Sequence, residues 1–180
     1  MFNITKRSKK GFSLLELLLV FGIIAALIVG VFMIYPKISS GQKVDSDIKI
    51  LGTLNAGIKE LYSGQAGYTG LSVDTLIKAK IVPEEIVDEG LIWDSWGANV
   101  QIEPYYDGSF YIGFENVSVD ACPKFVTQAG SSYFKIVVAS TEVKNTEAGQ
   151  ELDMANLSKA CISNDDGYGG RPITVYFYDK

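Results

Sequence analysis

The chain has 180 residues, a formal net charge of −5, 47% hydrophobic residues and no histidine. This length allows one globular domain plus a separate segment, and the hydrophobic content is sufficient for a core. Because histidine is the commonest general base and the commonest metal ligand, its absence excludes hydrolases with a histidine-containing triad and most zinc sites.

Basic charge is concentrated at the N-terminus, where no acidic residue precedes Glu16. Removal of residues 1–11 would leave 12 basic against 21 acidic side chains, a charge of −9. We expect no nucleic-acid partner for such an acidic product, because phosphate contacts need a basic face. The basic residues in the first eleven positions are Lys6, Arg7, Lys9 and Lys10.

The segment from Phe12 to Tyr35 is almost wholly apolar and contains one charged residue, Glu16. As a helix it would be roughly 36 Å long, which is enough to cross a bilayer core. The basic residues in front of it predict a cytoplasmic N-terminus by the positive-inside rule.

Helical periodicity continues beyond Pro36, although the sequence becomes more polar. Apolar residues recur at mostly three- or four-residue steps, which places one apolar stripe on a polar helix. We therefore predict a single helix from Phe12 to Tyr62, kinked near Pro36, whose second half packs against a head domain. The stripe consists of Ile38, Val44, Ile48, Leu51, Leu54, Ile58 and Leu61.

The remaining sequence alternates short helical and strand patterns. A Gly-rich loop at residues 63–72 precedes a short helix, with Ser72 as its N-cap. Period-two alternation on both sides of Asp107-Gly108 predicts a β-hairpin. The predicted elements are a helix at Val73–Lys80, hairpin strands around Val100–Ile102 and Phe110–Phe114, a helix at Asp120–Gln128, a strand at Tyr133–Ala139, a helix at Asp153–Cys161 and a final strand at Ile173–Tyr178.

The stretch Lys9-Lys10-Gly11-Phe12-Ser13-Leu14-Leu15-Glu16 is the most informative part of the sequence. An ordinary secretory signal ends at a small-residue cleavage site after the apolar region, but here the apolar region continues into an amphipathic helix. A simple membrane anchor would explain this continuity but not Glu16. A charge in an inserted helix costs on the order of 2.5 kcal/mol at its centre and requires a partner.

The run GFSLLEL, followed by an apolar segment, resembles the class III signal of type IV pilins and pseudopilins. The resemblance implies that a prepilin peptidase cuts between Gly11 and Phe12 and that Phe12 is then N-methylated. Glu16 matches the family's glutamate at the fifth mature position. The expected organisation is a leader peptide at 1–11, a transmembrane and filament-core helix at 12–35, and a periplasmic or extracellular head at 36–180.

Cleavage would create an α-amine on Phe12 at the start of an apolar helix. In a bundle of such helices, Glu16 of one subunit can neutralise the amine of its neighbour, which favours one axial register. The alternative is that Glu16 is simply solvated by lipid headgroups.

The head resembles type IVb pilins in the stretches LYSGQAGYTGL, IVPEE and WDSWGANVQI, whereas the short leader and Phe12 are more like type IVa. Cys122 and Cys161 form no CxxC pair, and in an exported protein they suggest one structural disulfide rather than two unrelated thiols. The resemblance implies that this disulfide closes the C-terminal region of the head.

We therefore predict an α+β pilin fold, in which a long N-terminal α-helix packs on an antiparallel β-sheet with a disulfide-closed C-terminal region. The implied function is that of a major pilin, assembled from the inner membrane into an extracellular pilus for adhesion, aggregation or conjugation. The implied partners are further copies of the chain, the prepilin peptidase and the pilus assembly machinery. No catalytic activity, cofactor or metal is expected. The alternatives are a pseudopilin or minor pilin, and a membrane-tethered enzyme or receptor.

Two further features have alternative interpretations. The Asn164-Asp165-Asp166-Gly167 stretch could bind calcium, but such clusters are usually turns, and the full EF-hand pattern is absent. Trp93 and Trp96 could form a sugar-binding platform, although packing in the core or between subunits is the more common role of residues this large.

Overall fold

A computed structural model describes residues 13–162 and 173–180, without the side chains of residues 32–38 and Asp107. Helix α1 spans Leu14–Leu61. The chain divides into two compact units, Met1–Ile38 and Ser39–Lys180. The boundary falls within α1, near the point where the sequence changes from wholly apolar to amphipathic.

Helix α1 agrees with the predicted helix over the described residues and continues through Pro36. A proline inside a helix removes one backbone hydrogen bond, and the kink near Pro36 stays a prediction. The helix ends at Leu61. The following turn contains Gly64 with a φ of +106°, a left-handed conformation that glycine adopts without steric cost.

The part of α1 in the head buries the predicted apolar stripe. Ile48 is partly buried beside it, Leu61 lies at its exposed end, and the side chain of Ile38 lies outside the described residues. Each fully buried aliphatic side chain contributes roughly 1.5–3 kcal/mol. The fully buried members are Val44, Leu51, Leu54 and Ile58.

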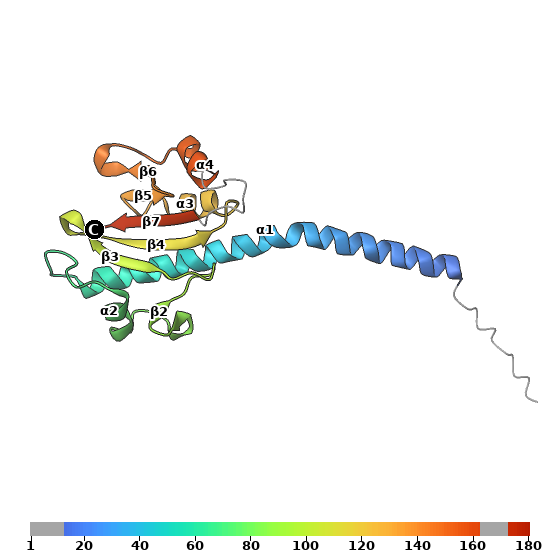
Figure 1. Ribbon diagram of the computed structural model, residues 1–180, viewed down its shortest axis with the longest axis horizontal. Coiled ribbons are helices and arrows are strands. Elements are labelled where there is room, and N and C mark those ends of the chain that lie inside the picture. The colour runs from blue at the N-terminus through green and yellow to red at the C-terminus, as the bar shows by residue number, and fades with distance from the viewer. Residues whose placement is uncertain (1–12, 163–172) are drawn as a thin grey trace, which may run out of the picture. The chain divides into compact units, whose positions relative to one another are not determined.

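The large sheet of the described head has five antiparallel strands in the order β3-β4-β7-β5-β6 (Figure 1). One face of this sheet joins the α1 stripe in a single core, which includes Phe110, Phe114, Phe125 and Phe177. The strands are β3 at Gln101–Tyr105, β4 at Ser109–Val117, β5 at Lys135–Val138, β6 at Thr141–Asn145 and β7 at Ile173–Asp179.

Three short helices lie close to their predicted positions: α2 at Val73–Lys78, α3 at Cys122–Ala129 and α4 at Met154–Ile162. The hydroxyl oxygen of Ser72 accepts a hydrogen bond from the Thr75 N–H, which confirms the predicted N-cap. Helix α2 ends before Lys80, contrary to the prediction, because Lys80 has a φ of +56°.

Several short elements were not predicted from the sequence. Strands β1 (Val87–Asp88) and β2 (Leu91–Ile92) form a small hairpin around Glu89 and Gly90, both with positive φ. The β5–β6 turn consists of Ala139 and Ser140, with φ values of +47° and +69°. A two-residue turn with two positive φ angles matches the right-handed twist of its strands. The 3₁₀ helices are η1 at Glu84–Ile86, η2 at Tyr106–Gly108 and η3 at Thr146–Ala148.

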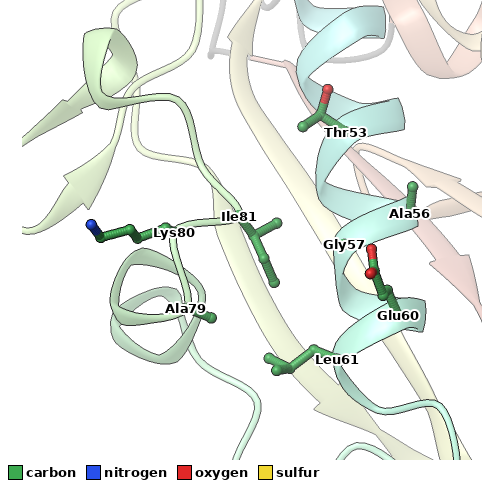
Figure 2. Close-up of a pocket in the computed structure, with 8 residues that line it drawn as sticks. All are labelled: Thr53, Ala56, Gly57, Glu60, Leu61, Ala79, Lys80 and Ile81. Carbon is green, nitrogen blue, oxygen red and sulfur yellow. The ribbon is translucent and has the colours of Figure 1, made fainter.

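Gly57 of α1 allows close packing of Ile81, because a Cβ at this position would lie 2.1 Å from Ile81 Cγ2 (Figure 2). We expect Gly57→Ala to lower the free energy of unfolding by about 1–2 kcal/mol, since overpacking outweighs the gain in helix propensity. Gly52→Ala is the matched control: no described atom lies within 4 Å of its Cβ position, so this change should stabilise by up to about 1 kcal/mol. Urea unfolding of the full chain in detergent micelles measures both changes. Equal effects of the two substitutions would contradict the packing argument.

Candidate assembly site

Of the site residues predicted near the N-terminus, only Glu16 lies in the part of the chain that the structure describes. Gly11 and Phe12 lie outside the described residues. Glu16 lies in the first turn of α1, with its side chain exposed. Ser13 directly precedes this helix: its carbonyl oxygen accepts from the Leu17 N–H at 3.1 Å, and its hydroxyl oxygen accepts from the Leu15 N–H at 3.4 Å. A carboxylate in the first turn interacts favourably with the helix dipole.

The segment Leu14–Val31, which contains Glu16, has a mean hydropathy of 2.8 and no buried residue within the described chain. Its large apolar side chains are exposed all round the helix, from 45% for Ile24 to 77% for Leu14. Eighteen helical residues extend about 27 Å, close to the thickness of a bilayer core. A continuous apolar surface of this size is not stable in water, so lipid or other apolar helices have to cover it.

Glu16 is the only ionisable residue in the segment Leu14–Val31. When lipid or helices cover the surrounding apolar surface, its carboxylate loses water and needs a cationic partner. Gly22 and Gly30 lie in the same segment, and a Cβ added to either would meet no described atom within 4 Å. Their small size therefore leaves open surface on which a neighbouring helix can pack closely.

The two cysteines of the chain lie in the head and form one disulfide between Cys122 of α3 and Cys161 of α4. Both residues are fully buried, and their Cα atoms lie 5.8 Å apart. The bridge encloses β5 and β6. The buried side chain of Lys144, in β6, donates hydrogen bonds to the carbonyl oxygens of Gly130 and Tyr133 and so connects this strand to the end of α3.

A polar contact connects α1 to the end of β7. The Asp179 carboxylate, which is 12% exposed, accepts from Asn55 Nδ2 at 2.8 Å and from Lys59 Nζ at 2.7 Å. Both donors belong to α1. A partly buried ion pair whose carboxylate also accepts a hydrogen bond keeps its geometry better than an exposed pair. This contact fixes α1 along the sheet at the opposite end of the stripe from Val44.

Tyrosines cover much of the sheet face that points away from the core. Tyr105, Tyr111, Tyr176 and Tyr178 pack edge to face or tilted, with ring centroids 4.9–5.6 Å apart. Lys135 Nζ lies 5.2 Å from the Tyr178 ring centroid. Burial raises the pKa of Tyr111, Tyr176 and Tyr178, so these phenols stay protonated at neutral pH. Tyr111 is half-buried, whereas Tyr105 is 39% and Tyr106 79% exposed.

An open groove of about 790 Å³ lies beside the contact between Gly57 of α1 and Ile81 in the segment that follows α2 (Figure 2). Its lining includes the ionisable side chains of Glu60 and Lys80, together with Thr53, Leu61 and Ile81. In the described parts of the chain, no three Cys, Asp or Glu residues group as a metal site, and the Asn164–Gly167 stretch lies outside those parts.

Two family models match the chain. The model described as "PilS N terminal" matches residues 42–169, and the one described as "Prokaryotic N-terminal methylation motif" matches residues 6–32. The chain belongs to the PilS family of type IV pilins. This confirms the resemblance that the GFSLLEL run and the head segments suggested.

Curated relatives and solved structures agree with this family. The major structural subunits of the bundle-forming pilus from Escherichia coli O111:H- and O127:H6 are each 26% identical over 162 residues, covering 86% of this chain and 84% of theirs. A type IV b pilin from Salmonella typhi superposes with a TM-score of 0.57, at 22% identity over 78% of this chain and 99% of its own. TcpA, a type IV pilin from Vibrio cholerae El Tor biotype, superposes with a TM-score of 0.54, at 16% identity over 77% of this chain and 99% of its own. Together with the Cys122–Cys161 bridge, these structures confirm the predicted α+β pilin fold with its disulfide-closed C-terminal region.

Loss of the disulfide should destabilise the pilin head. For a sequence separation of 39 residues, the chain-entropy estimate gives about 4 kcal/mol, and we expect the Cys122→Ser/Cys161→Ser double variant to lose about 2–4 kcal/mol. Urea unfolding with and without reductant tests this. Reductant should destabilise the unsubstituted pilin by the same amount and leave the double variant unchanged. Two free thiols in non-reducing peptide maps of exported protein would contradict the pairing.

Proposed function

We propose that this pilin is the major structural subunit of a type IV pilus. The observation that carries the proposal is the exposed apolar segment Leu14–Val31, with one carboxylate near its start. Packing these helices against one another in a filament replaces lipid contacts with helix contacts and keeps the apolar surface away from water. The relatives named as major subunits of the bundle-forming pilus support the major over the minor role.

The chain divides into three parts in this proposal. Residues 1–11 form a basic leader on the cytoplasmic side, residues 12–35 the membrane and filament-core helix, and residues 36–180 the head. The prepilin peptidase removes the leader between Gly11 and Phe12, and Phe12 becomes the N-methylated first residue. The match of the methylation-motif model to residues 6–32 supports this boundary.

Glu16 sets the register of assembly in this mechanism. The amine of Phe12 in an incoming subunit and the Glu16 carboxylate of a neighbour both lose their hydration in the filament core. Each compensates the other's charge only when the two helices are aligned at one axial offset. The partners are therefore further copies of the pilin. The assembly machinery transfers each subunit from the inner membrane to the extracellular filament.

The head has a structural role in this proposal. Its core, disulfide and ion pairs make a compact exterior for the filament, and a subunit role does not require catalysis. The excess of acidic over basic side chains outside the leader opposes binding to the phosphates of nucleic acids. Adhesion, aggregation or conjugation would be a property of the assembled surface.

Cleavage between Gly11 and Phe12 predicts the mass and the first residue of the mature protein. Intact-mass analysis and N-terminal sequencing of sheared, purified fibres should show a chain that begins with N-methylated Phe12. Fibres made chiefly of this chain support a major pilin. A mass that retains residues 1–11, or that lacks the apolar segment, would contradict the cleavage site.

Substitution of Glu16 separates a filament subunit from a passive membrane anchor. Glu16→Leu makes the segment more apolar, so membrane insertion should be unharmed. Filament assembly should fall by a hundredfold or more, because breaking a buried charge pair by removing one partner typically costs about 3–5 kcal/mol. Immunoblots of sheared and membrane fractions measure both effects.

Leu17→Ile is the control, because it changes the neighbouring position without altering charge. This variant should assemble at the unsubstituted level. A normal yield of fibres from Glu16→Leu would show that amine pairing is not needed, and the assembly mechanism would have to be abandoned.

A further inference from the structure

Two aspartates are buried where α1 meets the turn between β2 and β3. Asp47 of α1 is 0% exposed and Asp94 of the turn is 8% exposed. Asp47 Oδ1 accepts from the Ser95 N–H at 2.9 Å. Asp94 Oδ1 accepts from the N–H groups of Trp96 and Ala98, each at 2.9 Å. The second oxygen, Oδ2, has no hydrogen-bond partner in either residue within the described chain.

Asp94 organises the turn that Asp47 contacts. The Asp94 N–H donates to the Ala98 carbonyl oxygen at 2.9 Å, and the Gly97 N–H donates to the Asp94 carbonyl oxygen at 3.3 Å. Gly97 has a φ of +79°, which a tight turn of this kind requires. The Asp47–Ser95 hydrogen bond then attaches the turn to α1. We name residues 94–98 together with Asp47 the aspartate latch.

Burial and the neighbouring polar and charged groups shift the pKa values of the two aspartates in opposite directions. Burial raises the pKa of Asp94 to about 6, with a further contribution from the negative charge of Asp47, while the backbone N–H groups of the turn oppose the rise. Burial also raises the pKa of Asp47, while the Ser95 N–H, the nearby polar side chains of Ser95 and Trp96 and the positive charge of Lys43 lower it. Lys43 lies on α1, and its Nζ is 5.0 Å from the Trp96 ring centroid.

A proton suits this site better than a metal ion. Calcium takes six to eight oxygen ligands and magnesium takes near-octahedral oxygen, whereas the latch offers two unpartnered carboxylate oxygens. The ammonium of Lys43 and the indole N–H of Trp96 lie beside Asp47 and oppose a further cation. A proton on Asp94 Oδ2 removes the repulsion while Oδ1 keeps both of its backbone hydrogen bonds.

We propose that Asp94 and Asp47 form a proton-operated latch, in which protonation of Asp94 tightens the contact between the 94–98 turn and α1 and deprotonation loosens it. The folded state binds this proton more tightly than the unfolded state, whose aspartate has an ordinary pKa of 3.8. The contribution of Asp94 to stability is therefore greatest below about pH 4, is lost as the pH rises to about 6, and is constant above that.

Tryptophan fluorescence can test the latch directly, because both tryptophans of the chain are close to Asp94 in sequence. Trp93 directly precedes it, and Trp96 lies two residues after it. The full chain in detergent micelles should show a reversible change in emission with a midpoint near pH 6. Asp94→Asn should abolish this change, since an amide mimics the protonated acid. Asp47→Asn should move the midpoint to lower pH, since the neighbouring charge is lost.

Urea unfolding of the same samples measures the linked change in stability. The unfolding equilibrium constant of the unsubstituted chain relative to Asp94→Asn should rise roughly a hundredfold from pH 4 to pH 7, because each pH unit between the folded and unfolded pKa values is a factor of ten. Asp74→Asn, which removes an exposed aspartate of α2, should keep the fluorescence transition and the pH dependence of the unsubstituted chain.

The proposal would be overturned if Asp94→Asn kept the transition near pH 6, or if the unsubstituted chain showed none. It would also be overturned if calcium or magnesium at pH 7.5 reproduced the low-pH emission and stability, because a cation would then occupy the site. The test does not depend on filament assembly, so its outcome is independent of the proposed function.

Discussion

The head depends on the burial of one stripe of α1 against the sheet. Val44, Leu51, Leu54 and Ile58 supply one wall of the core, and the inner face of the five described strands supplies the other. A small sheet with one apolar face is not stable in water until something covers that face. The helix therefore has two apolar surfaces with different partners: the stripe belongs to the head, and the surface over Leu14–Val31 has to be covered by lipid or by other chains.

Polar contacts fix where α1 lies on the sheet, which apolar packing alone specifies less strictly. Near one end of the stripe Asp47 accepts a hydrogen bond from Ser95, and near the other end Asn55 and Lys59 donate to Asp179. Sliding the helix by one turn would leave the buried carboxylates of Asp47 and Asp179 without these partners, at a cost of several kcal/mol. The apolar stripe thus drives the packing, and the polar contacts choose its register.

Much of this arrangement could be predicted from the sequence, because it follows from strong periodic signals. The three- and four-residue spacing of the stripe and the alternation around Asp107-Gly108 each specify an element and its buried face. The hairpins at Glu89-Gly90 and Ala139-Ser140 could not be predicted, because three of these four residues are not glycine and the neighbouring sequence does not indicate their positive φ. Asp47 was overlooked although its position, three after Val44 and four before Leu51, places it on the stripe; its buried partner Asp94 is distant in sequence and required the structure.

The order of strands in the sheet has a consequence for how the head forms. Strand β7 follows the other strands in sequence, yet it lies between β4 and β5 and is the only link between the β3–β4 and β5–β6 pairs in the described sheet. Each hairpin can form early from local contacts. The two hairpins join only when residues 173–179 pair with both β4 and β5, and such non-local pairing is slow. A chain that lacks these residues consequently cannot complete its sheet. The topology thereby makes closure of the head depend on its last strand, so the two halves of the sheet join only when the rest of the head sequence is present.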